Sequence, residues 1–406
     1  YANDPGTIGS ASITNAILFI KGEYLVFEHL TIKDSWRGLV GRSGGKFIEI
    51  SDCSFINLGQ KGAIIISDEK SYFVENISVK NCTFSNIGEW GDTGSSSLTL
   101  GRFCRNTITE NCNFSGNGVD RGVDGILIEN LKKGVFFGEG SNHIIRGCTF
   151  SRLQENGIDL KHIVKSSMNE NRTTIMNNKF YEIGDFNRKL GHDIVLHHGC
   201  DGVDVVRNYF ESSIASIANV PHEGCNNANG NYRILYNTFA NTVYNIVIDN
   251  DENGIGNNEF VNNTCYNIGE KGDTYSIQIG TNNWTIKNNI FYKLSKAMET
   301  PCAIRFWSWV DIDTITLDHN CYWSDGNSCA YHWIDQSRKT ISEVEAHGVS
   351  QNPEFVGAEA DDFRLKKTSP CVRAGSSVSG VHPTTDIVGL ASPLTKNPSM
   401  GAYEFE

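Results

Sequence analysis

The chain has 406 residues, and it carries a net charge of −12. This length fits either one elongated repeat fold or two compact domains. The charge argues against nucleic acid as a partner, because nucleic-acid-binding domains carry a basic patch. No apolar run approaches the roughly 20 residues of a membrane span, so no such span is predicted. Forty glycines and only eight prolines indicate many turns and many short strands.

One aromatic position recurs along the chain, in steps mostly of 26 to 31 residues with one step of 36. It falls within DCSFINLG at 52–59, and weaker copies continue to NCYWSDG at 320–326. Short alternating runs such as TTIMN lie between the copies, and alternation indicates strands with one buried face. A period near 30 built of strands predicts a parallel β-solenoid, in which each coil stacks on its neighbours. The aromatic column consists of Phe55, Phe84, Phe114, Phe150, Phe180, Phe210, Phe239, Cys265, Phe291 and Tyr322.

Coils of this length, with about three strands each, resemble the right-handed parallel β-helix of polysaccharide-active enzymes. We therefore predict an all-β, right-handed parallel β-helix of about ten coils with a C-terminal capping tail. A β-propeller is the competing fold, but its blades need about 40 residues and four strands. Residues 1–326 are assigned to the β-helix, and residues 327–406 to C-terminal coils and a capping tail of the same domain.

The C-terminal stretch resembles the tail that is common in secreted bacterial β-helix proteins. No signal peptide is visible, but the chain starts abruptly at Tyr1, which is compatible with a processed N-terminus. We expect a secreted or cell-surface bacterial protein that acts as a monomer.

One further column accompanies the aromatic one, two residues before it. The first coils place cysteine there, and we expect these thiols to form a buried, unbridged stack, since neighbouring strands of a solenoid rarely give disulfide geometry. Later coils place asparagine there, and these side chains are expected to form an amide ladder with a structural role. The cysteines are Cys53, Cys82, Cys112 and Cys148, and the asparagines begin at Asn178 and end at Asn320.

A second set of strands begins about a dozen residues after each aromatic position. The first apolar residue of each strand is expected to point inward, and residues then alternate. The second and fourth residues of this count therefore point outward, in two columns. The first column is Val40, Ile65, Thr99, Leu127, Asp159, Val195, Ala218, Val247, Gln278 and Arg305. The second is Arg42, Ser67, Gly101, Glu129, Lys161, His197, Val220, Asp249, Gly280 and Trp307.

Polar side chains of the middle coils concentrate on this outward face, which favours a site over a uniformly solvated surface. Lys161, His197 and His192 are the candidate catalytic residues, because lysine and histidine can act as general bases. The candidate substrate-binding residues are Arg102, Glu129, His162, His198, Asp249, Arg305 and Trp307.

Three oxygen-bearing side chains at the entry of consecutive strands, with a fourth projecting from mid-strand, predict a Ca²⁺ site, because Ca²⁺ takes carboxylate and amide oxygens. They are Asp124, Glu155, Asn156 and Asp159. Asp-Gly and Asn-Gly pairs are also strong turn formers, which is the alternative interpretation of Asp124 and Asn156. A bound cation would allow a negatively charged protein to bind a polyanion.

Two reactions fit such a groove. The first is β-elimination on a uronic-acid polymer, in which a cation or an arginine neutralises the C6 carboxylate and a base removes the C5 proton. The second is glycoside hydrolysis by two carboxylates, with Asp124, Glu155, Asp159, Asp193 and Asp249 as candidates. A non-enzymatic carbohydrate-binding solenoid is a third class, but it leaves the charge cluster unexplained.

The sequence VDGILIE, followed by NHIIRGCTFSRLQENGIDLKH, resembles the pectate lyases of polysaccharide lyase family 9. The resemblance implies a Ca²⁺-dependent lyase that acts on an acidic polysaccharide, with the four ligands named above. Two features depart from the family pattern: Glu155-Asn156 replace two aspartates, and the strand GHDIVLHHG lacks the family's catalytic lysine. Either Lys161 or His197 has then taken that role, or the chemistry differs. The same coils faintly resemble polygalacturonases, and uronate epimerases also use such a groove.

Overall fold

The computed structural model divides the chain into two compact units, one ending at Gly202 and one starting at Val203. Each unit is built almost entirely of parallel strands. The described residues are 15–67, 73–88, 95–101, 104–116, 123–129, 131–132, 135–136, 142–163, 172–188, 190–197, 199–220, 229–269, 275–294, 302–324, 330–332, 337–378, 383–391 and 397–405.

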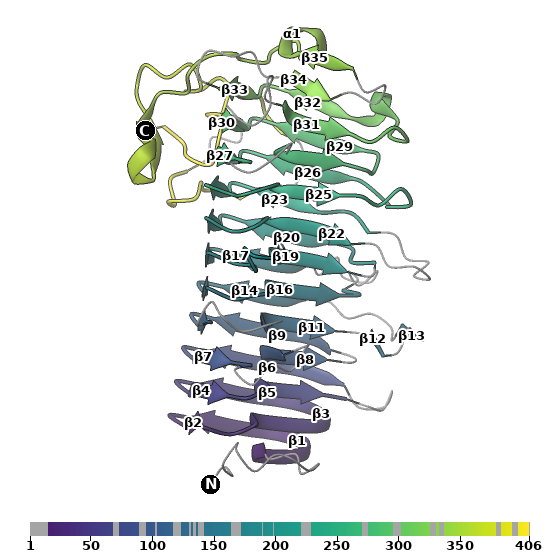
Figure 1. Cartoon of the computed structure of the whole chain (residues 1–406), viewed down its shortest axis with the longest axis vertical. Helices are drawn as coiled ribbons and strands as arrows, with labels where there is room; N and C mark the ends of the chain where they lie inside the picture. The colour runs from purple at the N-terminus through teal and green to yellow at the C-terminus, as the bar shows by residue number, and fades with distance from the viewer. Residues whose placement is uncertain are drawn as a thin grey trace. The chain divides into compact units, whose positions relative to one another are not determined.

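The first unit stacks its strands coil upon coil, from β1 at one end to β19 (Figure 1). Equivalent strands of successive coils pair in parallel, as β11 does with both β8 and β16. One series of strands consists of β2 (Thr31–Lys33), β4 (Ser54–Leu58), β7 (Thr83–Ile87), β10 (Asn113–Ser115), β15 (Thr149–Ser151) and β18 (Lys179–Tyr181).

The other two series of the first unit are joined by its two long strands, β1 (Asn15–Glu28) and β3 (Arg37–Ser51). One comprises β5 (Lys61–Ile66), β8 (Ser95–Gly101), β11 (Val123–Glu129), β16 (Asn156–Lys161) and β19 (His192–His197). The other comprises β6 (Val74–Lys80), β9 (Cys104–Glu110), β14 (His143–Arg146) and β17 (Thr173–Met176). A short antiparallel hairpin, β12 (Leu131–Lys132) and β13 (Val135–Phe136), branches off after β11.

The second unit repeats the same coil. Its first series of strands consists of β21 (Tyr209–Glu211), β24 (Thr238–Ala240), β27 (Thr264–Ile268), β30 (Ile290–Leu294) and β33 (Cys321–Trp323). The second consists of β22 (Ile217–Val220), β25 (Val247–Asp249), β28 (Ile277–Ile279), β31 (Cys302–Phe306) and β34 (Ala330–His332). The third consists of β20 (Val203–Val206), β23 (Arg233–Leu235), β26 (Asn258–Val261), β29 (Trp284–Lys287) and β32 (Thr316–Asp318). The prediction of a parallel β-helix is confirmed.

The predicted aromatic column forms the core of each unit. In the first unit five phenylalanines from Phe55 to Phe180 stack with ring centroids 4.7–4.9 Å apart, and none is exposed. In the second unit the column contains Cys265, and the space of the missing ring is filled by Phe260, whose centroid lies 6.0 Å from Phe239 and 6.2 Å from Phe291. Stacked rings thus occupy the core at each of these coils.

The cysteine and asparagine columns also form as predicted. The four thiols are free and buried, and the backbone N–H of Cys112 points at Sγ of Cys148, 3.4 Å away. In the second unit each backbone N–H of the column donates to the side-chain amide oxygen of the next coil, as Asn263 does to Asn289 at 2.8 Å. Glu345 ends this ladder by accepting from the backbone and side chain of Asn320.

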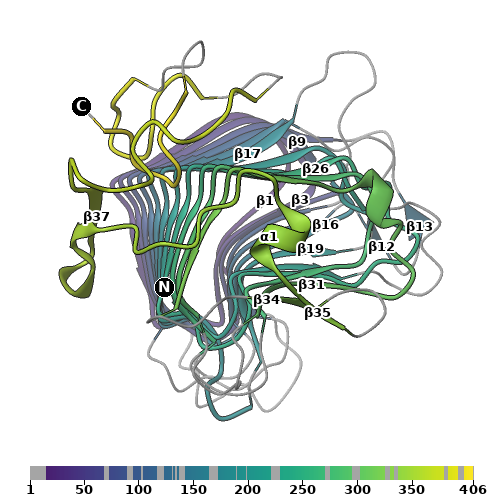
Figure 2. The ribbon, with the colours of Figure 1, turned by 90° about the horizontal axis from the view of Figure 1, so that it is seen from above.

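The C-terminal part of the chain packs on the second unit. A segment with β35 (Arg338–Thr340) and α1 (Ile341–Val344) follows the last coil, and Val349 pairs with Cys321 in β33. Farther on, β36 (Phe355–Gly357) and β37 (Asp362–Leu365) flank the 3-10 turn η3 (Ala358–Ala360), while a second 3-10 turn, η2 (Ile312–Thr314), precedes β32. Figure 2 shows β37 and the C-terminus outside the stacked strands, where Phe363 and Met400 join a core cluster with Tyr266 and Ile290.

No helix among the described residues is both long enough and apolar enough to cross a membrane.

Candidate active site

A glycine near the start of β11 and of β16 decides which of their side chains face the site. A Cβ atom at Gly125 would lie 2.8 Å from Cδ1 of Phe150, and one at Gly157 would lie 2.9 Å from Cδ1 of Phe180. These glycines therefore face the aromatic core, and so do the next residues, Ile126 and Ile158, which are fully buried. Two consecutive inward positions break the simple alternation, so the residue before each glycine points away from the core.

Three rows of side chains follow from this arrangement, each running across neighbouring strands. The first row contains Lys61, Ser96, Asp124, Asn156 and His192; the second contains Thr99, Leu127, Asp159 and Val195; the third contains Gly101, Glu129, Lys161 and His197. The outward expectation for Ile65 is wrong, since Ile64 pairs with Thr99 while Ile65 is completely buried.

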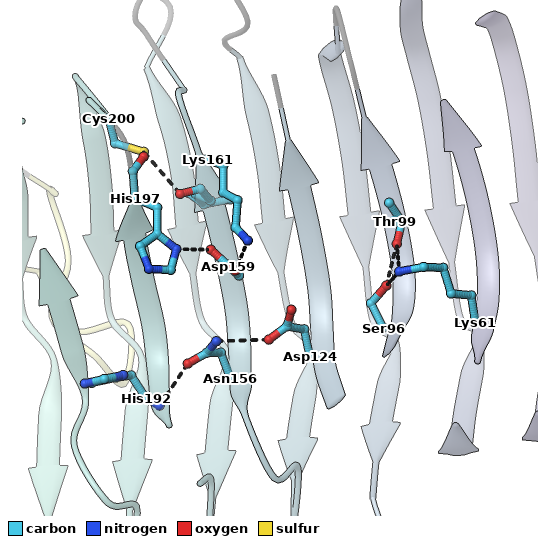
Figure 3. A network of polar contacts seen from close by, with 11 residues as sticks. Lys61, Ser96, Thr99, Asp124, Asn156, Asp159, Lys161, His192, His197 and Cys200 are labelled. Carbon is cyan, nitrogen blue, oxygen red and sulfur yellow. Dashed lines mark hydrogen bonds and ion pairs between the residues drawn. The ribbon is translucent and has the colours of Figure 1, made fainter. Parts of the chain in front are cut away.

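Asp159 is the centre of the site. Its carboxylate oxygens lie 3.0 Å from Nζ of Lys161 and 2.8 Å from Nδ1 of His197, and the residue is 3% exposed (Figure 3). Burial alone would raise the pKa of Asp159, but the hydrogen bond of His197 and the charge of Lys161 outweigh it and lower that pKa. A buried, ionised carboxylate thus holds two cationic or proton-carrying groups side by side.

A second polar group lies beside it in the first row. Nδ2 of Asn156 donates to Oδ1 of Asp124 at 3.0 Å, and the backbone N–H of His192 donates to Oδ1 of Asn156 at 3.1 Å (Figure 3). Burial, followed by the charges of Asp159 and Glu155, raises the pKa of Asp124 well above its usual range. Burial and the charge of Asp159 likewise raise the pKa of Glu155. These two carboxyls therefore bind protons more tightly than Asp159 does.

The imidazole of His192 is held neutral. Its burial, with a smaller contribution from the charge of His197, lowers its pKa to about 4. At neutral pH His192 is accordingly unprotonated beside the Asn156 amide.

Lys61 extends the first row, and the sequence analysis did not single it out. Its Nζ donates to Oγ of Ser96 at 2.9 Å and to Oγ1 of Thr99 at 3.3 Å, and these two hydroxyls also contact each other (Figure 3). The signal that marks it is its place before Gly62, since Asp124 and Asn156 also precede such glycines.

Two predicted substrate-binding residues occupy other positions than expected. Asp249 was expected to point outward, but it is 1% exposed and its carboxylate accepts hydrogen bonds from Asn219, Thr281 and Trp284. The physical reason is that Ile246 takes the first of the two consecutive inward positions in its coil. Counting from Ile246 as the first apolar residue therefore shifts the predicted inward and outward positions of this strand by one residue. His162 is also buried, at 3% exposure, in a left-handed turn with φ 55°.

Arg305 and Trp307 lie together in the second unit. The guanidinium carbon of Arg305 lies 4.1 Å from the ring centroid of Trp307 and 5.4 Å from that of Tyr275, which is cation–π geometry. Trp307 stacks on Trp309 at 4.9 Å and donates to Oδ1 of Asn250 at 3.0 Å. Such an aromatic surface can stack on sugar rings.

The remaining candidates cannot be placed as side chains. Arg102 and His198 lie outside the described residues, and so does the side chain of Glu129, whose backbone pairs with that of Lys161.

The four predicted Ca²⁺ ligands fit a cation in part. Asp159 is committed to Lys161 and His197, and among the described residues the carboxylates of Asp124, Glu155 and Asp159 do not form a group with all donor atoms within 4.8 Å of one another. Burial, and after it the neighbouring carboxylates, raise the pKa of Asp124 and of Glu155, and a bound cation would offset the charge repulsion. The fit is therefore confined to Asp124, Glu155 and the amide oxygen of Asn156.

The stacked coils place this chain among the parallel β-helix proteins. The family model described as "Right handed beta helix region" matches residues 15–232, more than half of the chain, and the chain belongs to that family. A search of curated proteins finds no match.

Several solved structures are similar to this chain. Pectate lyase Pel9A is 14% identical over 96% of this chain and 88% of its own, with a TM-score of 0.44. The complex of XylC with xylose is 11% identical over 84% of this chain and 66% of its own, with a TM-score of 0.50. A mannuronic acid specific polysaccharide family 6 lyase from human gut microbiota is 14% identical over 85% of this chain and 87% of its own, with a TM-score of 0.41. At these identities the likeness shows the fold alone.

Proposed function

We propose that this protein is a lyase that cleaves a uronic-acid-containing polysaccharide by β-elimination. The observation that carries the proposal is the buried Asp159 carboxylate, shared by Lys161 and His197 at 3.0 and 2.8 Å. A buried carboxylate that orients a histidine through Nδ1 is a recurrent way to prepare a general base.

His197 is the proposed base. Its hydrogen bond to Asp159 favours the tautomer with the proton on Nδ1, so that Nε2 of the neutral ring carries the lone pair. Nε2 takes the C5 proton of the sugar, the released electron pair forms the C4=C5 double bond, and the C4–O bond breaks. His197 then returns the proton to the leaving oxygen, and Asp159 stabilises the intervening imidazolium.

Lys161 is proposed to stabilise the negative charge that grows on the C6 carboxylate as the C5 proton leaves. Its register beside His197 places the ammonium and the base on adjacent strands, about 4.8 Å apart. A fixed cation at the position where charge develops is the main electrostatic contribution to such a reaction.

We further propose that Asp124, Glu155 and Asn156 hold a Ca²⁺ ion, which would neutralise the substrate carboxylate when bound. Asp159, the fourth predicted ligand, instead serves the base in this proposal. The proposed substrate is an extracellular polymer, which agrees with the expectation of a secreted or cell-surface protein.

The deciding experiment incubates the protein with pectate, alginate and glycosaminoglycans and records the ultraviolet absorbance of an unsaturated uronate product. A rise with one of these polymers is expected. New reducing ends without that absorbance would instead indicate hydrolysis.

Hydrolysis is the second candidate, because one observation favours it. The pKa of Asp159 is lowered while those of Asp124 and Glu155 are raised, and glycoside hydrolases pair an ionised carboxylate with a protonated one. The ion pairs of Asp159 argue against its use as a nucleophile, which ranks this candidate below elimination.

Asp124→Asn tests the cation site in two ways. We expect chelation by EDTA to lower the activity of the wild type and added Ca²⁺ to restore it, whereas the variant should no longer respond to Ca²⁺. The second readout is thermal unfolding without metal. Because the folded pKa of Asp124 lies above the unfolded value, ionisation costs stability as pH rises above about 4. Asp124→Asn should therefore unfold at a higher temperature at pH 7; equal melting temperatures would contradict this.

Lys61→Ala tests whether the row of side chains from Lys61 to His192 binds sugar units that lie beyond the proposed catalytic residues. Lys61 lies two strand spacings from Asp124, about 10 Å, and can pair with a more distant uronate carboxylate. We expect KM to rise on the order of tenfold with little change in kcat. Lys33→Ala, an exposed lysine of β2, is the matched control and should leave KM unchanged.

A further inference from the structure

Three potential metal ligands meet at the end of the last coil in the second unit. Oδ1 of Asp318 lies 3.0 Å from Nδ1 of His347, and Oδ2 lies 2.8 Å from Nδ1 of His319. In the described part of the chain, this is the one group of three histidine, cysteine or acidic side chains whose donor atoms all lie within 4.8 Å of one another. Neither histidine belongs to the candidate active site.

The fold holds the first two ligands on a strand end. Asp318 is the last residue of β32, and His319 follows it in a left-handed turn with φ 54°. In the preceding coils of this unit Asn262 and Asn288 occupy the same turn position, with φ values of 54° and 58°. Histidine and asparagine both tolerate this conformation, so His319 is not required by the turn.

The third ligand comes from the segment that follows α1. Glu345 is buried against Asn320, and the backbone of Val349 donates to the carbonyl of Asn320 at 2.8 Å. These anchors on either side fix the position of His347, whose side chain is 62% exposed and can adjust to a ligand. The cluster thus joins the last coil to the segment packed on it.

Hydrogen bonding explains this cluster incompletely. His347 makes a hydrogen bond to Asp318, but Nδ1 of His319 is buried and makes none with any described residue, although Oδ2 is only 2.8 Å away. The donor separations of 2.8 and 3.0 Å are close to the roughly 3.3 Å between ligands on a tetrahedral zinc with bonds of about 2.0–2.1 Å.

We propose that Asp318, His319 and His347 bind a divalent transition metal, with Zn²⁺ as the probe. Two imidazole nitrogens and one carboxylate suit Zn²⁺ and its first-row neighbours, whereas Ca²⁺ prefers oxygen ligands alone. The metal links the last coil to the segment after α1, and it stabilises the folded second unit because it binds the folded state. This site is independent of the proposed lyase reaction.

The test is calorimetric titration of the EDTA-treated, dialysed 406-residue chain with Zn²⁺. We expect one site in the wild type and no measurable binding at that site in His319→Asn, because the variant loses one of only three protein ligands. Asparagine fits the left-handed turn, as Asn262 and Asn288 show, so this variant should fold. His29→Asn is the matched control, because exposed His29 stands in an equivalent turn of the first unit with φ 53°, and it should bind Zn²⁺ like the wild type.

Thermal unfolding gives a second readout. Zn²⁺ should raise the melting temperature of the wild type and of His29→Asn, but not that of His319→Asn or Asp318→Asn. Absence of Zn²⁺ binding in the wild type, or equal binding in wild type and His319→Asn, would overturn the proposal. A zinc site that persists in both variants would have to lie elsewhere, which counts against these three ligands.

Discussion

Replacing His197 by alanine is expected to lower kcat for polymer cleavage by about 10²–10⁴-fold, the range typical of a lost general base. The reason is that the other titratable side chains of β19, His192 and Asp193, stand at the opposite end of the strand from His197, while Asp159 fixes the ring of His197 through Nδ1. The rise of ultraviolet absorbance on the polymer that the wild type cleaves measures the effect. KM should change much less than kcat, because the base acts in the transition state.

Two further variants separate catalysis from folding in this experiment. His29→Ala, at an exposed turn of the first unit, should keep wild-type activity. Lys161→Met keeps the length of the side chain but removes the charge, and it should lower kcat while leaving His197 paired with Asp159. Wild-type activity in His197→Ala would refute the base assignment, and Lys161 and His192 would then be the remaining candidates.

The fold could be predicted from the sequence because every coil of a solenoid has the same local structure and the same packing against its neighbours. Phe55, Phe84 and Phe114 fall at one register position, and a stack of rings needs nothing from distant parts of the chain. The same argument covers the thiol column and the asparagine ladder, which together occupy a second register position, two residues before the rings. Where the repeat is broken, prediction from the column fails: Cys265 leaves a gap that Phe260 fills from another strand.

The site was harder to predict because it depends on the start of each strand. The sequence names Asp124, Asn156, Asp159, Lys161 and His197 as candidates, since polar residues within an apolar strand are conspicuous, and their role stays a prediction. The contacts among them depend on which of two consecutive residues faces the core, and that is set by packing of the glycine against a phenylalanine ring. Asp249 shows the consequence: Ile246 stands in the glycine's place, so counting from it as the only inward residue wrongly places the buried Asp249 outward.

Asp159→Asn is expected to have the second large effect, because it removes a charge that contacts both Lys161 and His197. Breaking a buried ion pair from one side typically costs about 3–5 kcal/mol, and the amide that replaces the carboxylate recovers part of it by hydrogen bonding. The variant should therefore unfold at a lower temperature and denaturant concentration than the wild type. Activity should fall about as far as it does in His197→Ala, since the His197 ring loses the partner that fixes its tautomer.

The pH dependence of stability distinguishes this role from simple packing. The folded pKa of Asp159 lies below its unfolded value, so the unfolded state binds more protons, and the contribution of Asp159 is present above about pH 4 and lost as pH falls through the folded pKa. The wild type should thus lose its advantage over Asp159→Asn in acid, whereas a packing defect would leave a constant difference. Asp124 and Glu155 act in the opposite direction, because their raised pKa values favour the folded state at low pH. Comparing Asp159→Asn with Asp124→Asn across pH should therefore give slopes of opposite sign relative to the wild type.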